Sequence, residues 1–172
     1  MTETGLKTII AAAFLFVAGC GGHAPYQVAI EPQGAKIVTG RFPVSLLESD
    51  SSFLWYPQNY SSFVPDSSSI SSLSKSARNV RFVIVGGTWC GDTKRELPRF
   101  FKIMALAKIP PENIELYGVD RAKRSGDGIS EKYDIVSVPT FILLSNGKEI
   151  GRIVEYPKRS LELDMVDLLQ KK

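Results

Sequence analysis

The sequence predicts an α/β domain in which a mixed central sheet carries helices on both faces. The segment 80–87, "VRFVIVGG", is short, rich in β-branched residues and ends in glycines, as expected for a buried central strand. A helix with a regular apolar stripe is predicted to follow it. Two apolar runs within 137–156 flank Asn146-Gly147, a strong signal for a hairpin. One sheet therefore has to contain both a parallel crossover and an antiparallel pair.

Before this strand, the sequence predicts a small hairpin, an aromatic arm and one short helix. "YQVAI" (26–30) and "AKIVTG" (35–40) are strand-like and are separated by "EPQG". Asp66 is a candidate N-cap for a helix, because apolar residues follow it at helical spacing. Segment 49–76 is rich in serine, but its aromatic residues predict that it packs on the domain, since a solvated linker gains nothing from them. These aromatic residues are Phe53, Trp55, Tyr56, Tyr60 and Phe63.

After the central strand, the predicted elements alternate between helix and strand. The helix that begins near Cys90 contains Pro98, which predicts a kink, and "PP" at 110–111 ends it. A strand at 113–120 and a short helix at 129–133 come next, and Ser160 is the candidate N-cap of a final helix. The inward-facing residues predicted for the two long helices are Leu97, Phe100, Phe101, Met104, Leu161, Met165, Leu168 and Leu169.

The first twenty residues have the features of a targeting signal. Lys7 precedes the apolar run 9–18, which is too short to span a bilayer core of roughly 30 Å. The run continues into "VAGC" (17–20), which resembles the processing box of bacterial lipoproteins. The resemblance implies that residues 1–19 are a lipoprotein signal peptide and that Cys20 carries acyl chains, which anchor the protein to a membrane of the cell envelope, outside the cytoplasm. We expect 20–65 to form a tether and N-terminal arm, and 66–172 the main domain.

The motif "GTWCGDTKRELPRF", together with "SVPT" at 137–140, resembles the thioredoxin family over roughly residues 70–172. Trp89 and Cys90 match the pair that enters the active-site helix, and Lys94 matches the basic residue after the motif. Pro98 matches the helix-kinking proline, and Pro139-Thr140 the cis-proline loop. The motif is more closely similar to that of envelope thioredoxin-like proteins with a single cysteine. The resemblance implies a thioredoxin-like fold in which Val138, Pro139 and Thr140 form a platform for an extended substrate peptide.

Cys90 is the candidate nucleophile. A thiol at a helix N-terminus faces unpaired N–H groups and the positive end of the helix dipole, and both favour the thiolate. Thr93 is predicted to donate its hydroxyl to the sulfur, and Lys94 to add positive charge. Trp89 is expected to shield the sulfur, whereas the carboxylate of Asp92 opposes a thiolate.

Two departures from the thioredoxin pattern limit the activity. Position 93 is a threonine, so a mixed disulfide at Cys90 has no internal thiol to resolve it. Ile84 occupies the position at which thioredoxins bury an aspartate. Three interpretations of Cys90 remain open: a monothiol oxidoreductase with an external resolving thiol, a catalytically inactive binding module, and a thiol peroxidase-like site.

Other functional classes have little support in the composition. The formal charge is +3 over 172 residues, with one small basic cluster at 121–124, so nucleic-acid binding is not expected. A single histidine, His23, predicts no metal site, and no cofactor is expected. The expected partners are protein or small-molecule thiols and disulfides, and a membrane through Cys20.

Overall fold

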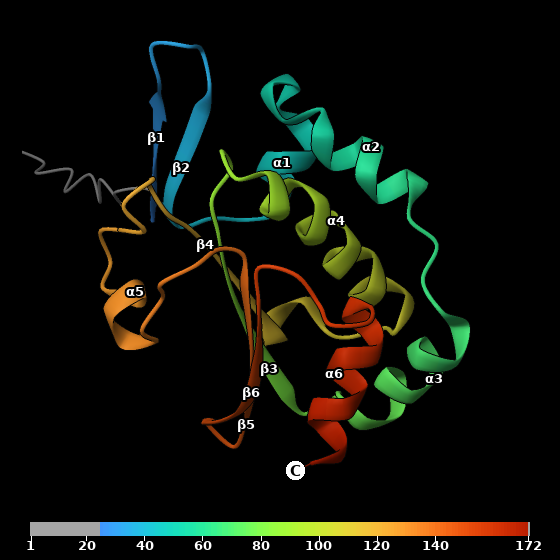
Figure 1. Cartoon of the computed structure of the whole chain (residues 1–172). Coiled ribbons are helices and arrows are strands. Elements are labelled where there is room, and N and C mark those ends of the chain that lie inside the picture. Colours follow the sequence, from blue (N-terminus) through green and yellow to red (C-terminus); the bar gives the residue numbers. More distant parts are fainter. Residues whose placement is uncertain (1–24, 172) are drawn as a thin grey trace, which may run out of the picture.

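A six-stranded mixed sheet forms the centre of the protein in the computed structural model, which describes residues 25–171 (Figure 1). The strand order is β1-β2-β4-β3-β5-β6. Only β3 and β4 pair in parallel; the other neighbours are antiparallel, which confirms the predicted mixed sheet. The strands are β1 (Tyr26–Ile30), β2 (Lys36–Arg41), β3 (Val80–Gly86), β4 (Ile114–Gly118), β5 (Thr140–Ser145) and β6 (Lys148–Val154). The predicted signal peptide, residues 1–19, and Cys20 lie outside the described residues.

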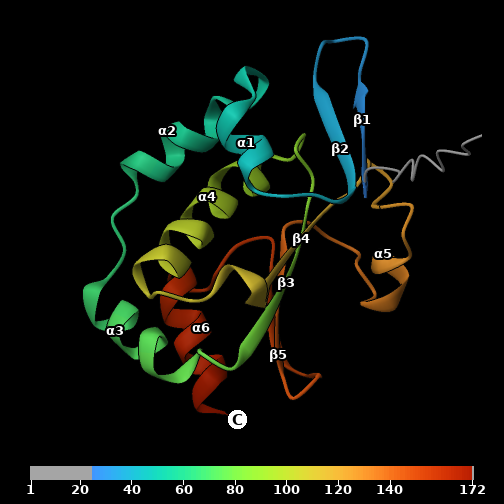
Figure 2. The same ribbon diagram turned by 180° about the vertical axis from the view of Figure 1, so that it is seen from behind.

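Helices cover both faces of the sheet, but unequally. Figures 1 and 2 show α5 on one face and the other helices on the opposite face. The helices are α1 (Ser45–Ser49), α2 (Trp55–Ser62), α3 (Ser67–Ser76), α4 (Gly91–Leu106), α5 (Ile129–Lys132) and α6 (Leu161–Gln170). Within residues 25–171, none of these helices is both long and apolar enough to cross a bilayer.

Helix α4 packs on the sheet through an aromatic cluster. The ring of Phe100 lies 5.7 Å from that of Phe82 on β3 and 5.3 Å from that of Phe141 on β5. Leu97 and Met104 are buried on the same face, as the apolar spacing predicts. Pro98 lies inside the helix, which nevertheless continues to Leu106. This packing fixes where the N-terminus of α4 meets the end of β3.

The aromatic arm packs against the outer side of α4, which confirms the expectation that it lies on the domain. Phe53 and Tyr56 are buried, and the ring of Tyr56 lies 6.4 Å from that of Phe101. Helices α1 and α2 were not predicted, because α1 has only five residues, the apolar residues of α2 have weak helical periodicity, and no side chain caps either helix. Tertiary packing therefore decides their conformation.

The short-range signals give the correct element boundaries at three places. Asp66 caps α3 by accepting a hydrogen bond from Ser69 N–H (2.7 Å). Ser160 caps α6 in the same way, although its bond to Leu163 N–H is longer (3.4 Å). Asn146 and Gly147 both have positive φ angles, as the turn between β5 and β6 requires.

The N-terminal hairpin belongs to the same sheet as the rest of the domain. Strand β2 joins β4 through only two residue pairs, Gly40 with Gly118 and Arg41 with Tyr117. The backbones approach so closely that a Cβ at Gly118 would overlap the carbonyl oxygen of Val38. Residues 26–63, assigned from the sequence to a tether and arm, thus contribute two strands and two helices to this layered fold.

We expect Gly118→Ala to push β2 away from β4 and to lower the free energy of unfolding by about 1–3 kcal/mol, as overpacking does. Urea denaturation measures this change. Gly91→Ala is the matched control, because a Cβ at Gly91 meets no atom within 4 Å. Equal destabilisation by both substitutions would contradict the close approach at Gly118.

Candidate functional site

Cys90 lies at the junction between β3 and α4, where it is the N-cap residue of the helix. Its backbone is extended, with φ −83° and ψ 131°. Its N–H donates to Gly87 O (2.8 Å), and its carbonyl accepts from Lys94 N–H (3.0 Å). A turn thus leads from the strand into the helix, and the sulfur is placed at the helix N-terminus, as predicted.

The sulfur of Cys90 faces the loop that precedes β5. The side chain is half-buried, and the thiol donates to the carbonyl oxygen of Val138 (3.3 Å). The peptide bond between Val138 and Pro139 is cis. Thr140 is buried next to it, and its hydroxyl donates to Ser137 O (2.7 Å). The fold therefore brings together the two halves of the predicted site, although Cys90 and Val138 are 48 positions apart in the sequence.

Thr93 does not make the contact that was predicted for it. Its side chain is 1% exposed, and its hydroxyl oxygen accepts a hydrogen bond from Gly87 N–H (3.2 Å). Among the described residues, the hydrogen bond of the Cys90 sulfur goes to Val138 instead. The side chain of Thr93 points toward the end of β3, because position 93 lies on the inward face of the first turn of α4. Thr93 thus joins α4 to the turn after β3.

Trp89 is held beside the site by three contacts. Its indole N–H donates to Val119 O (3.0 Å), and its ring lies so close to Gly87 that a Cβ there would overlap it. The guanidinium of Arg121 stacks over the indole at 5.1 Å and also pairs with both carboxylate oxygens of Glu31 (2.6 and 2.8 Å). The Arg121 guanidinium holds the pKa of Glu31 below its usual value.

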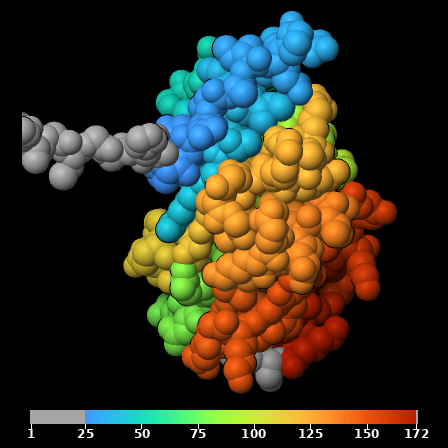
Figure 3. All heavy atoms as spheres, turned by 90° about the vertical axis from the view of Figure 1, so that its left-hand side faces the viewer, coloured from blue at the N-terminus to red at the C-terminus, as the bar shows by residue number. Residues whose placement is uncertain are grey.

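The N-terminal hairpin is attached directly to the loop that carries Trp89 and Cys90. The hydroxyl of Thr88 donates to Lys36 O (2.9 Å) and accepts from Val38 N–H (3.3 Å). Glu31, in the turn between β1 and β2, supplies the ion pair to Arg121. Figure 3 shows the hairpin (blue) next to the segment that contains α5 (orange). A hollow of about 580 Å³ lies between the hairpin and residues 120–127, and Cys90 does not line it.

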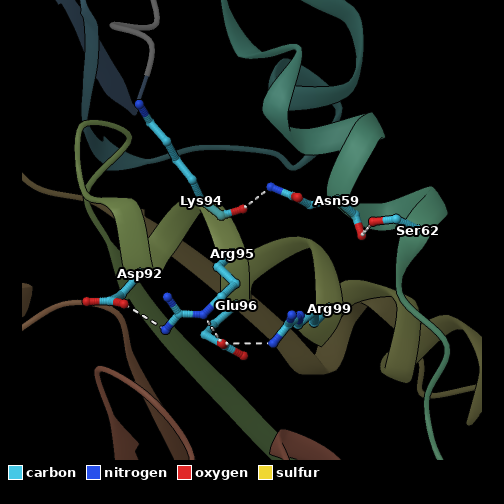
Figure 4. A network of polar contacts seen from close by, with 7 residues as sticks. All are labelled: Asn59, Ser62, Asp92, Lys94, Arg95, Glu96 and Arg99. Atoms are coloured by element: carbon cyan, nitrogen blue, oxygen red, sulfur yellow. Dashed lines mark hydrogen bonds and ion pairs between the residues drawn. The ribbon is translucent and has the colours of Figure 1, made fainter.

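Lys94 has a structural contact through its backbone. Its carbonyl accepts from the side-chain amide of Asn59 on α2 (2.9 Å), which ties the aromatic arm to the first turn of α4. The Lys94 side chain extends away from Asp92 and Glu96 (Figure 4). Stabilisation of a thiolate by its ammonium group stays a prediction.

A chain of alternating charges runs along the first two turns of α4 (Figure 4). Arg95 contacts the carboxylate of Asp92 (2.7 Å) and that of Glu96 (2.7 Å). Arg99 makes a second contact with Glu96 (3.1 Å). The Glu96 side chain is 2% exposed, and its Oε2 is buried without a hydrogen-bond partner. The hydrogen bond to Glu96, followed by that to Asp92, raises the pKa of Arg95 above its ordinary value.

Three of these features were not predicted from the sequence. The spacing of Asp92 with Arg95, and of Glu96 with Arg99, is a signal for helical ion pairs and was available in the sequence. The burial of Glu96 could not be predicted from the sequence, because it depends on the elements that pack around its side chain. The hairpin contacts through Thr88 likewise join residues far apart in the chain.

Ile84 is fully buried in the larger apolar cluster, so an apolar side chain fills the position at which thioredoxins have an aspartate.

No metal site can be assembled from the described part of the chain, where no three side chains of His, Cys, Asp or Glu gather closely enough to hold an ion. The site consists instead of one thiol, the carbonyl of Val138, and the side chains around the start of α4. A cysteine at a helix N-terminus, beside a cis-proline loop on a mixed sheet, defines a thioredoxin-like class of protein.

The comparisons with known proteins agree with this class. The family model described as thioredoxin matches residues 55–169, so the chain belongs to the thioredoxin family. A thioredoxin-like protein of Acanthamoeba polyphaga mimivirus is 32% identical over 83 residues, which are 48% of this chain and 58% of the relative. A thioredoxin of Echinococcus granulosus is 37% identical over 67 residues, which are 39% of this chain and 57% of the relative. The matched segments thus cover less than two thirds of either relative.

A solved structure supports the same fold. It is a Pseudomonas aeruginosa protein of unknown function, with a TM-score of 0.52 and 19% identity. The match covers 77% of this chain and 91% of the other. At this level of identity the likeness concerns the fold alone. Together, the family match and the fold define a thioredoxin-like protein, consistent with a redox role.

We expect Arg121→Ala to free the indole of Trp89 and to increase its quenching by acrylamide, because the stacked guanidinium is removed. The measurement uses a Trp55→Phe background, in which Trp89 is the only tryptophan. Arg124→Ala is the control for the quenching measurement, since Arg124 pairs with Asp120 in the same loop. Equal quenching in both variants would contradict the stacked arrangement.

The ion pair that holds Arg121 depends on pH. Because the folded-state pKa of Glu31 is lowered, its pairing with Arg121 is present at neutral pH and is lost as the pH falls through that lowered pKa.

Proposed function

We propose that this protein carries out thiol-disulfide exchange with Cys90 as its only reacting thiol and an external thiol to complete the cycle. The observation that carries the proposal is the position of Cys90: half-exposed at the N-terminus of α4, with its sulfur 3.3 Å from Val138 O beside a cis-proline. A helix N-terminus favours the thiolate, which is the reactive form. Family membership supports the same chemistry.

The reaction takes place in two exchanges. First, the Cys90 thiolate attacks one sulfur of a disulfide; a new sulfur–sulfur bond forms, the old one breaks, and the other sulfur leaves as a thiolate. Because position 93 is a threonine, the mixed disulfide has no neighbouring thiol in this chain. A second, external thiolate then attacks the mixed disulfide and releases Cys90 as a thiolate.

The substrate platform of this proposal is the loop formed by Val138, Pro139 and Thr140. Apolar side chains border it: Val136 is 78% exposed and Tyr156 is 64% exposed. Glu155 N–H donates to Pro139 O (2.7 Å), so the segment after β6 lies against this loop. An extended peptide that carries a disulfide fits such a surface, because backbone pairing positions it and the apolar side chains contact its side chains.

The proposed location is the cell envelope. This part of the proposal depends on the sequence of residues 1–20, in which a short apolar segment leads to "VAGC". Acyl chains on Cys20 anchor the domain outside the cytoplasm, where disulfides form and persist. Cys90 is then the only free thiol of the anchored protein.

A second candidate is a binding module without turnover. It is favoured by Ile84 and Thr93, both buried, which occupy the positions at which dithiol thioredoxins have an aspartate and a second cysteine. This protein would keep the peptide platform and bind partners without exchange.

We expect the full chain with Cys20→Ser, incubated with oxidised glutathione, to form a persistent mixed disulfide at Cys90 and to release one reduced glutathione; mass spectrometry detects the mixed disulfide. Addition of an external thiol is expected to release it. Thr93→Cys supplies an internal thiol and is expected to release glutathione without an added thiol. Thr93→Ser is the matched control and is expected to retain the mixed disulfide. A Cys90 that forms no mixed disulfide in the folded chain would favour the binding module.

We expect the full chain to remain with the membrane fraction when it is expressed in a bacterial host, and Cys20→Ser to prevent acylation. Incorporation of labelled palmitate measures this. Cys90→Ser is the control, and it is expected to be labelled like the unchanged chain. Equal labelling of the Cys20→Ser variant would contradict the lipoprotein assignment.

A further inference from the structure

Asp92 raises a problem for a reactive Cys90. Only one residue separates them, and a nearby carboxylate disfavours a second negative charge. Asp92 lies in the first turn of α4, where an acidic side chain interacts favourably with the helix dipole. Whether this negative charge acts on the sulfur depends on what binds the carboxylate.

Arg95 binds Asp92 and is itself held from the other side. Its guanidinium contacts Asp92 at 2.7 Å and Glu96 at 2.7 Å, and thus lies between two carboxylates (Figure 4). Asp92 and Arg95 are both about two-fifths exposed, whereas Glu96 is 2% exposed. One guanidinium, that of Arg95, therefore binds both the exposed carboxylate of Asp92 and the buried carboxylate of Glu96.

The burial of Glu96 restricts where Arg95 can go. An ionised carboxylate that is removed from water has to be paired, and the unpartnered Oε2 shows that no further donor reaches Glu96 from another element. Arg95 and Arg99 are its contacts among the described residues. Release of Arg95 would leave Glu96 with Arg99 alone, so Arg95 stays in the place from which it also reaches Asp92.

We propose that Arg95, held in place by buried Glu96, is a positioning residue that binds and neutralises the Asp92 carboxylate, and thereby removes its opposition to the reactive, deprotonated form of Cys90. The proposal rests on the proposed function, because it concerns the reactivity of the same sulfur. Arg95 acts through Asp92 and touches neither the sulfur nor the substrate. The motif thus contains an acidic residue together with the group that compensates for it.

The test is a double-mutant cycle on the pH–rate profile of Cys90 alkylation by iodoacetamide, in the full chain with Cys20→Ser. Arg95→Gln is expected to move the profile to higher pH and to slow alkylation at pH 7 by up to about five-fold, the size that a partly exposed ion pair supports. Asp92→Asn is expected to speed alkylation. Arg95→Gln in the Asp92→Asn background is expected to change little.

Two further variants separate this role from a general effect on the helix. Arg99→Gln removes a positive charge that also binds Glu96 but does not contact Asp92, so the profile is expected to stay in place. Arg95→Lys keeps a charge near Asp92 and is expected to restore part of the rate. Thermal unfolding of each variant shows whether it is folded under the conditions of the assay.

The possible failures are distinguishable. If Cys90 of the unchanged site reacts no faster than the same cysteine in the unfolded chain, the proposed function fails. If it reacts faster, the next comparison is the effect of Arg95→Gln in two backgrounds. If Arg95→Gln slows alkylation by the same factor in the otherwise unchanged chain and in the Asp92→Asn background, Arg95 does not act through Asp92 and the inference is overturned. An equal effect of Arg99→Gln would also overturn it.

Discussion

The packing of α4 on the central sheet is the constraint on which the rest of the structure depends. Phe100 lies against Phe82 and Phe141, on the two adjacent strands β3 and β5. Aromatic burial of this kind is among the largest contributions that single side chains make to stability. Because β3 leads into α4 and β5 begins just after the cis-proline, the same packing sets the distance between Cys90 and Val138. The position of the thiol is therefore a consequence of the core.

Polar contacts from distant segments then define the start of α4. Thr93 joins its first turn to Gly87, and the amide of Asn59 joins it to α2. Thr88 attaches the preceding loop to the N-terminal hairpin. Each contact gives a backbone group a side-chain partner, and at the buried N–H of Gly87 the loss of this partner would be costly. The N-terminal arm and hairpin thus contribute to the site, although they precede the strand and helix that carry the motif.

The chemistry of the site differs from that of a dithiol protein in a consistent way. Thr93 and Ile84 are both buried, and their side chains fill space and make structural contacts where a second thiol and an acid would act. Both side chains are packed in the interior, and Ile84 belongs to the larger apolar cluster. Charge near the sulfur is arranged along α4 itself, where Arg95 lies between Asp92 and Glu96. The domain thus has the thioredoxin family fold with one cysteine, Cys90, at the start of α4.

The sequence by itself determined the elements with strong local signals: the buried strand β3, the amphipathic helix α4, the turn at Asn146-Gly147 and the caps at Asp66 and Ser160. It also predicted that Cys90 lies at the start of α4 and that the bond before Pro139 is cis, because both residue types are informative at these positions. Only the tertiary structure decided the helices of the serine-rich arm, the partner of Thr93 and the burial of Glu96. Local propensity is weak in these places, and contacts between residues far apart in the chain set the outcome.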